Sequence, residues 1–393
     1  MPAAAYRFGD FELDLGRYEL RRAGQLVHVE PQVFEVLAYL VRHHGQTVLK
    51  TELLDAVWGS RYVSDSTLTS RIKAARRALG DDGHRQSAIA TVHGRGYRFV
   101  VPIDAAPGPG RDPPQEIRYC VAADGVHLAY AVTGEGPPLV KAANWLTHID
   151  REWTSPVWRH WLEALAERHT LVRYDERGCG LSDREVPDFG FEARVADLEC
   201  VLDAVGVERF PLLGLSQGGA VAIAYAVRHP ERVTHLVLAG AFARGRFVRA
   251  ETEEERAEAL LDLEVARVGW CRGDSAFRQF FATQFLPDAS PPLWDAFSEL
   301  QRDTTSAGNV VRFLDEFGRI DVSDLAPRVR CPTLIFQSRG DLRVPEKQAR
   351  ELAALIPNSR LVLLDSRNHI LMRDEPAWPV FTAELERFLA SAA

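Results

Sequence analysis

One serine of the chain lies in a glycine-flanked pattern that is typical of a catalytic nucleophile. The segment Gly214-Leu-Ser216-Gln-Gly218 follows an apolar run and precedes a stretch with helical periodicity. A serine that attacks a carbonyl carbon must stand on a tight strand-to-helix turn, where only small neighbours fit. The amides that begin the helix then face the place where negative charge develops. Ser216 is therefore the predicted nucleophile of an acyl-transfer reaction.

A serine nucleophile needs a general base, and the base needs a carboxylate that orients it. Asp341 follows a predicted strand over residues 333–337, and His369 follows the next one, over 361–364. The chain order serine, acid, histidine suits a nucleophile on such an elbow, and open α/β sheets place their sites at the carboxyl ends of strands. Ser216, Asp341 and His369 form the predicted triad. Asp365 is the rival acid and ranks below Asp341.

Strands alternate with helices around these residues. The predicted strands cover residues 117–121, 127–132, 138–142, 171–174, 210–215, 235–239, 333–337 and 361–364. The predicted helices cover 156–168, 191–205, 218–228, 347–356 and 377–390. This alternation predicts a mostly parallel sheet with helices on both faces, beginning with an antiparallel hairpin.

Residues 117–390 resemble the α/β-hydrolase fold superfamily. The matching motifs are Tyr174-Asp-Glu-Arg-Gly-Cys-Gly-Leu-Ser-Asp183, the serine elbow, Gly340-Asp341 and Asn368-His369. The resemblance implies an oxyanion hole built from the amides of Trp145 and Gln217. Asn144 stands where such proteins usually carry His-Gly, and asparagine tolerates the positive φ expected there. The resemblance also implies a helical cap over about residues 243–328, whose many aromatic residues favour an apolar ligand.

The first 104 residues carry a different pattern. Leu68, Ile72, Ala75 and Leu79 share one face of a predicted helix over residues 64–79, while the opposite face carries cations and hydroxyls. Long cations neutralise DNA phosphates, and short hydroxyls allow hydrogen bonds to base edges. A glycine-rich hairpin follows at 89–101. The predicted DNA contacts are Ser70, Arg71 and Lys73 at bases, Arg76, Arg77, Thr91, His93 and Arg95 at phosphates, and Thr67 beside them.

Residues 6–103 resemble the OmpR/PhoB-type winged-helix DNA-binding domain. The predicted order is short strands (6–13, 18–21, 26–28), three helices and a hairpin. The motifs are Ala56-Val-Trp-Gly, Val63-Ser-Asp-Ser-Thr-Leu, Arg76-Arg-Ala-Leu-Gly and Thr91-Val-His-Gly-Arg-Gly-Tyr-Arg-Phe. The resemblance makes residues 64–79 the recognition helix and the hairpin the wing. The expected fold is thus an α+β winged helix-turn-helix followed by an α/β-hydrolase domain.

Charge and composition agree with two domains. The 393 residues carry a net charge of −8, yet residues 1–104 contain 14 basic and 12 acidic side chains. The Pro- and Gly-rich segment 105–115 predicts a linker between domains at 1–104 and 116–393. Five scattered cysteines argue against a disulfide framework and a thiolate metal site. With neither a secretory signal nor an apolar run of about 20 residues, the chain is expected to be cytoplasmic and away from membranes.

The favoured function is a one-component transcription regulator that binds double-stranded DNA and binds and hydrolyses a small apolar ester, lactone or amide. Two alternatives stay open. One is a plain serine hydrolase with an N-terminal tether. The other is a regulator whose inactive hydrolase fold serves ligand sensing or dimerisation. No metal or organic cofactor is expected, and a homodimer is possible.

Overall fold

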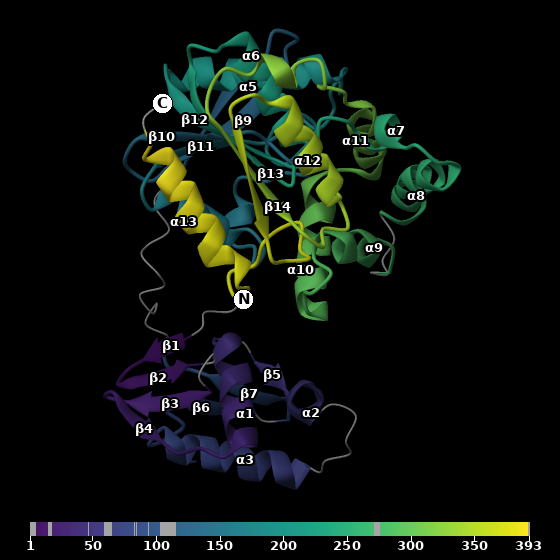
Figure 1. The fold of residues 1–393 in the computed structure, drawn as a ribbon. Helices are drawn as coiled ribbons and strands as arrows, with labels where there is room; N and C mark the ends of the chain where they lie inside the picture. The colour runs from purple at the N-terminus through teal and green to yellow at the C-terminus, as the bar shows by residue number, and fades with distance from the viewer. Residues whose placement is uncertain are drawn as a thin grey trace. The chain divides into compact units, whose positions relative to one another are not determined.

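The computed structural model describes residues 5–14, 18–45, 47–58, 65–81, 83, 85–92, 94–102, 115–270 and 276–391. The chain separates into two compact units, Met1–Arg111 and Asp112–Ala393 (Figure 1). The predicted linker lies outside the described residues except for Gln115. No described helix is long and apolar enough to cross a bilayer.

The described residues of the N-terminal unit form two antiparallel sheets and three helices. Strands β1 (Ala5–Phe8), β2 (Phe11–Asp14), β3 (Glu19–Arg22) and β4 (Gln25–Val27) form the first sheet in that order. The helices are α1 (Pro31–Arg42), α2 (Lys50–Trp58) and α3 (Asp65–Ala78). Strands β5 (Val48–Leu49), β6 (Ile89–Val92) and β7 (Gly96–Phe99) form the second sheet, in the order β5-β7-β6.

Two local expectations for this unit need correction. The single strand expected over residues 6–13 is a hairpin, because Gly9 adopts a φ of +52° and turns the chain between β1 and β2. The two-residue strand β5 was not expected at all, and it pairs Val48 with Tyr97 of β7. Apolar side chains of α1 and α3, such as Leu37, Leu40 and Ile72, are buried together in this unit's own core.

The C-terminal unit is built on one eight-stranded sheet in the order β15-β14-β13-β12-β10-β11-β9-β8. The strands are β8 (Glu116–Val121), β9 (His127–Thr133), β10 (Pro138–Lys141), β11 (Thr170–Tyr174), β12 (Phe210–Leu215), β13 (Val233–Ala239), β14 (Thr333–Ser338) and β15 (Ser359–Leu364). The pairs β8–β9 and β9–β11 are antiparallel and the others are parallel. The predicted mostly parallel sheet with an initial hairpin is confirmed.

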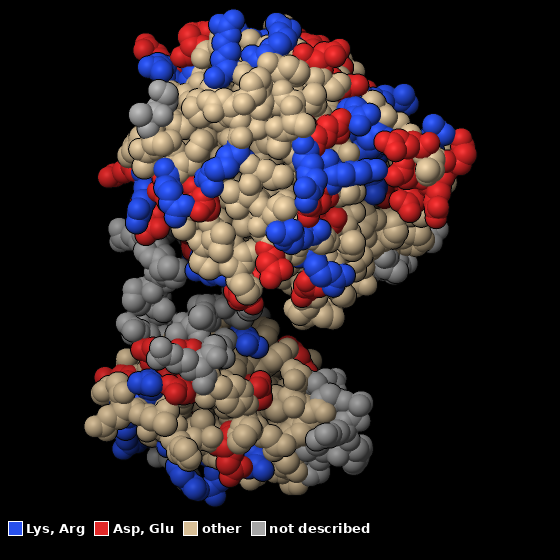
Figure 2. All heavy atoms as spheres, in the orientation of Figure 1, with Lys and Arg blue, Asp and Glu red and all other residues tan. Residues whose placement is uncertain are grey.

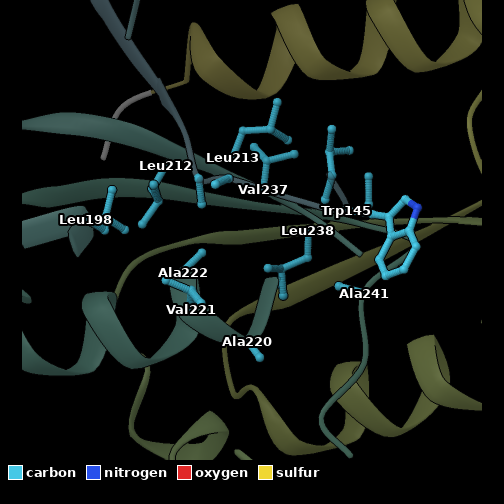
Figure 3. Close-up of a cluster of buried hydrophobic side chains, with 14 of the residues drawn as sticks. Trp145, Leu198, Leu212, Leu213, Ala220, Val221, Ala222, Val237, Leu238 and Ala241 are labelled. Atoms are coloured by element: carbon cyan, nitrogen blue, oxygen red, sulfur yellow. The ribbon is translucent and has the colours of Figure 1, made fainter. Parts of the chain in front are cut away.

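Helices cover both faces of this sheet. Consecutive side chains of a strand point to opposite faces, so the continuous burial along β14 requires cover on each side. The helices packed against the strands are α4 (Arg159–Ala166), α5 (Phe191–Val205), α6 (Gly218–Arg228), α12 (Glu346–Leu355) and α13 (Ala377–Leu389). Figure 3 shows Ala220 and Ala222 of α6 on the side of the sheet to which Leu212 of β12 and Leu238 of β13 point, where small alanine side chains let the helix approach the sheet.

A helical segment connects β13 to β14, where the cap was expected. It contains α7 (Arg246–Arg249), α8 (Glu253–Gly269), α9 (Ala276–Phe285), α10 (Pro291–Thr304) and α11 (Ala307–Arg319) (Figure 1). The amphipathic helix α11 buries Val310, Phe313 and Phe317, and α9 buries Phe281 and Phe285. The cap therefore joins the large core of this unit through its aromatic side chains.

Candidate functional site

Ser216 stands on the turn between β12 and α6. Its φ is +52°, in the left-handed region that costs a non-glycine residue about 1–2 kcal/mol. The Ser216 amide donates a 2.9 Å hydrogen bond to the Ala239 carbonyl on the neighbouring strand, which holds the turn in place. A Cβ at Gly218 would lie 2.4 Å from the Ala143 carbonyl oxygen, so only glycine fits there. The surrounding structure thus maintains a strained serine, as is typical of functional positions.

The structure brings His369 and Asp341 together. Nδ1 of His369 lies 2.7 Å from Oδ2 of Asp341, and both side chains are buried. The other carboxylate oxygen of Asp341 accepts hydrogen bonds from the amides of Arg343 and Val344, at 2.8 and 2.9 Å. These bonds fix the carboxylate so that it can orient the imidazole. The rival acid Asp365 is exposed.

Phe285, at the end of cap helix α9, also positions His369. The His369 amide donates a 2.8 Å hydrogen bond to the Phe285 carbonyl, and the two rings meet edge to face at 5.3 Å. Ser216, His369 and Phe285 line one cavity of about 330 Å³, its opening to solvent included, together with Trp158 and other apolar residues. All three predicted triad residues therefore gather at the carboxyl edge of the sheet.

The predicted oxyanion donors Trp145 and Gln217 lie beside Ser216. Both residues are buried and line a cavity with Ser216. Among the described residues, neither backbone amide donates a hydrogen bond, so both are available to an oxyanion. The Trp145 indole donates a 3.2 Å hydrogen bond to Gln301 of α10 and stacks at 6.0 Å on Phe285, so the cap holds this loop.

The expectation for Asn144 was wrong. The positive φ in this loop belongs to Leu146, at +50°, and not to Asn144. The Asn144 side chain instead accepts a hydrogen bond from the buried Lys141 ammonium. Burial lowers the pKa of Lys141, and the amide oxygen gives its ammonium a partner. Asparagine at this position therefore serves a buried polar contact.

A second cavity beside Ser216 is lined by Trp145 and Gln217 and also by charged residues that the sequence pattern did not indicate. It encloses about 520 Å³, its opening to solvent included, and three arginines and one aspartate line it: Arg246, Arg249, Arg343 and Asp262. The spacing of Arg246 and Arg249 is visible in the sequence, but their shared cavity with Arg343 and Ser216 depends on how the cap folds over the sheet. The expected aromatic lining is present as well, through Phe242, Phe247, Phe285 and Phe317.

The loop after β11 is held by buried ion pairs. Arg177 binds Asp197 through two hydrogen bonds of 2.7 and 2.6 Å, and both side chains are buried. Asp183 accepts a 2.8 Å hydrogen bond from the His127 amide. These contacts give both residues structural roles.

Helix α3 has the two faces that its sequence predicts. Leu68, Ile72 and Ala75 are buried against the core, whereas Ser70, Lys73 and Arg77 are exposed. Figure 2 shows basic side chains at the edge of the N-terminal unit along which α3 runs in Figure 1. Arg95, at the tip of the β6–β7 hairpin, is exposed too. A basic helix and a basic hairpin tip thus belong to one small unit.

Other predicted DNA-contact residues are bonded within the unit. Arg76 donates to the Ile89 carbonyl at 3.0 and 2.7 Å and to Thr91 Oγ1 at 2.8 Å, so it connects α3 to β6. Arg71 binds Glu30 and Gln32 near the start of α1. Thr67 is half-buried on the flank of α3, and His93 lies outside the described residues.

Comparison with known proteins supports both halves. The family model described as alpha/beta hydrolase fold matches residues 152–376, and the model described as transcriptional regulatory protein, C terminal, matches residues 24–99. A pyrrolizixenacetamide deacetylase from Xenorhabdus hominickii is 30% identical over 268 residues, which is 67% of this chain and 95% of the relative.

Solved structures share the fold of the larger unit. An esterase from Exiguobacterium antarcticum superposes with a TM-score of 0.58 at 22% identity and covers 70% of this chain and 99% of its own. The enol-lactonase from Burkholderia xenovorans gives a TM-score of 0.57 at 24% identity, with 70% and 100% coverage. The chain therefore belongs to the alpha/beta hydrolase fold family, and it carries ahead of that domain a DNA-binding domain of the kind found at the C terminus of transcriptional regulatory proteins.

Proposed function

We propose that this chain is a one-component transcription regulator whose C-terminal domain hydrolyses a small carboxylic ester or amide with Ser216 as nucleophile. The observation that carries the proposal is the 2.7 Å contact between His369 and Asp341 in a site whose cavity also contains the strained Ser216. A deacetylase among the relatives supports hydrolysis of an acyl bond.

The residues suit a two-step acyl transfer. His369 accepts the Ser216 proton while the serine oxygen attacks the carbonyl carbon, and Asp341 stabilises the imidazolium that forms. The amides of Trp145 and Gln217 receive the negative oxygen of the tetrahedral intermediate. His369 then gives its proton to the leaving group, and a water molecule activated by the same histidine releases the acyl group from Ser216.

The regulatory half of the proposal depends on α3. Its exposed Ser70, Lys73 and Arg77 offer one hydroxyl and two cations on one helix face, which suits a helix in the major groove. In this proposal the exposed Arg95 on the hairpin tip contacts the backbone of the same duplex. The matched regulatory domain family makes DNA the expected partner.

Active-site labelling tests the chemistry. A fluorophosphonate probe should label the wild-type chain, because the activated serine attacks phosphorus as it would a carbonyl carbon. Ser216→Ala should give no labelling, whereas Ser298→Ala, which changes a buried cap serine, should label like the wild type. Equal labelling of wild type and Ser216→Ala would remove Ser216 from the mechanism.

DNA binding tests the regulator. Wild-type protein should bind a duplex from its own promoter region with an affinity that falls steeply as salt rises, because phosphate contacts release counterions. Failure to bind this duplex or random DNA, even at low salt, would favour a plain hydrolase.

A further inference from the structure

The second cavity beside Ser216 carries an excess of positive charge. Arg246, Arg249 and Arg343 line it, and among the described residues that line it Asp262 is the one acidic side chain. Arg249, Arg343 and Asp262 are all buried. Burying a charge without a partner is costly, so three guanidinium groups that share one carboxylate are unusual for a site that takes only apolar ligands.

The single carboxylate is already occupied by two of the arginines. Asp262 Oδ2 binds Arg343 at 2.6 Å and also binds Arg246. Burial by itself raises the pKa of Asp262, but the two cations outweigh that effect and hold the pKa below its ordinary value. Asp262 therefore stays ionised, and its charge is divided between two partners.

Arg249 is the arginine without an acidic partner. Among the residues that the structure describes, no carboxylate lies within ion-pair distance of its guanidinium, which donates only to the carbonyls of Arg244 and Arg343, at 3.5 and 3.3 Å. Burial lowers the pKa of Arg249 to about 10, so the group stays charged at neutral pH. Asp341 and Glu255 attract it from a distance, but Asp341 is engaged by His369.

The two cavities divide the substrate at Ser216. His369 lines the apolar cavity, and it must reach the leaving group to protonate it. The arginine cavity contains Trp145 and Gln217, but His369 does not line it. A leaving group in that cavity could not receive the His369 proton, so the arginine cavity receives the acyl chain. Resting on the proposed hydrolase function, we infer that the arginine cavity binds a carboxylate on the acyl part of the substrate, so that the substrate is a half-ester or half-amide of a dicarboxylic acid.

The reaction then balances as an ordinary hydrolysis. The Ser216 oxygen bonds to the acyl carbon, the alcohol or amine leaves with the proton from His369, and water hydrolyses the acyl-enzyme. The distal carboxylate stays ionised and unchanged throughout. Guanidinium groups suit this task because they present paired donors to the two oxygens of a carboxylate.

The test separates anion binding from catalysis. Calorimetry on the full chain compares 4-phenylbutyrate with its neutral amide, which has nearly the same shape. The carboxylate should bind at least tenfold more tightly, the preference should shrink in high salt, and Arg249→Gln should abolish it. The matched control Arg256→Gln, on the exposed side of α8, should keep it. If Arg249→Gln does not fold, the partly exposed Arg246→Gln replaces it.

Hydrolysis of mono(4-nitrophenyl) glutarate and 4-nitrophenyl pentanoate, with spontaneous rates subtracted, then locates the anion. The half-ester should show a kcat/KM at least tenfold higher in the wild type and in Arg256→Gln, but not in Arg249→Gln. The proposal would be overturned if 4-phenylbutyrate and its amide bound equally well, or if neither bound. It would also be overturned if Arg249→Gln kept the preference for the carboxylate. A carboxylate preference in a chain that fluorophosphonate fails to label would refute hydrolysis and keep the anion site.

Discussion

Ser216 combines two properties that oppose each other in one residue. Its hydroxyl is exposed to a cavity because the backbone turns sharply, and the turn requires a φ of +52°. Glycine adopts this region without a Cβ penalty, whereas serine and alanine do not. The residue that the chemistry needs is therefore less suited to the local backbone than glycine would be.

This strain leads to a stability prediction. The free energy of unfolding of Ser216→Gly should be about 1 kcal/mol higher than that of Ser216→Ala. Both changes remove the hydroxyl, but only glycine relieves the φ strain. Urea denaturation followed by tryptophan fluorescence measures the difference. Equal stability of the two variants would show that the turn is not strained in solution.

The sequence predicted the triad candidates because their signals are local. Ser216 is marked by its flanking glycines, and Asp341 and His369 each follow an apolar strand. The arginine cavity was not predicted, because its members come from α7, the loop after β14 and α8. An arginine in a sequence looks the same whether it faces solvent or a cavity, and only the folded cap distinguishes these cases. The catalytic roles themselves remain predictions.

Arg76 shows the same limit at the level of elements. The sequence pattern placed Arg76 correctly on α3 but did not identify its partner, because a guanidinium can donate either to a phosphate or to a backbone carbonyl. In the structure Arg76 joins α3 to β6 through Ile89 and Thr91. Helix α3 and the β6–β7 hairpin are therefore connected by a residue that the sequence pattern assigned to DNA contact.

Two neighbouring arginines should consequently behave differently. Arg76→Gln should lower the stability of the N-terminal unit by about 1–3 kcal/mol, because it leaves the Ile89 carbonyl and the Thr91 hydroxyl without their charged donor. Arg77→Gln, on the exposed face, should leave stability unchanged and reduce the salt dependence of DNA binding by about one phosphate contact. Thermal unfolding and binding titrations at several salt concentrations distinguish them. Equal destabilisation by both changes would contradict the assignment.

Helix α4 is tied to the segment that carries the histidine of the site. His160 Nε2 lies 2.9 Å from the Leu371 carbonyl, two residues beyond His369, and the ring packs edge to face on Trp378. Burial lowers the pKa of His160 to about 4, and the hydrogen bond to Leu371 offsets this only in part. The folded chain therefore keeps this histidine neutral under mildly acidic conditions.

This depressed pKa predicts acid sensitivity. The unfolded chain binds a proton at His160 near pH 6.5, but the folded chain does so only near pH 4, so stability falls as the pH drops between these values. The loss should be about 3 kcal/mol relative to His160→Gln, which can keep the hydrogen bond without titrating. Tryptophan-detected urea unfolding at several pH values measures it. His44→Gln, which changes an exposed histidine, is the control. Parallel stability–pH profiles of the wild type and His160→Gln would contradict the prediction.

At the scale of the whole molecule, the two units differ in surface charge. The C-terminal unit carries all of the acidic excess, and Figure 2 shows acidic side chains gathered over α8. The N-terminal unit presents cations on α3. This charge distribution suits a chain in which the N-terminal unit binds a polyanion and the acidic C-terminal unit is repelled by it.

If the hydrolase domain regulates the DNA-binding domain, occupation of Ser216 must change DNA affinity. Fluorophosphonate-treated wild type should bind promoter DNA at least fivefold differently from untreated protein, which corresponds to a coupling free energy of about 1 kcal/mol. Ser216→Ala treated in the same way should show no change. Fluorescence anisotropy with labelled duplex measures both. Identical affinities before and after labelling would make the two units functionally independent.

The bond between the Phe285 carbonyl and the His369 amide has a consequence for access. Cap helix α9 is hydrogen-bonded to the backbone of His369, the predicted proton acceptor. Movement of α9 away from the sheet would break this hydrogen bond and displace the His369 imidazole, so the open site would lack its proton acceptor. If the proposed hydrolysis takes place, we expect it only while the cap is closed over Ser216.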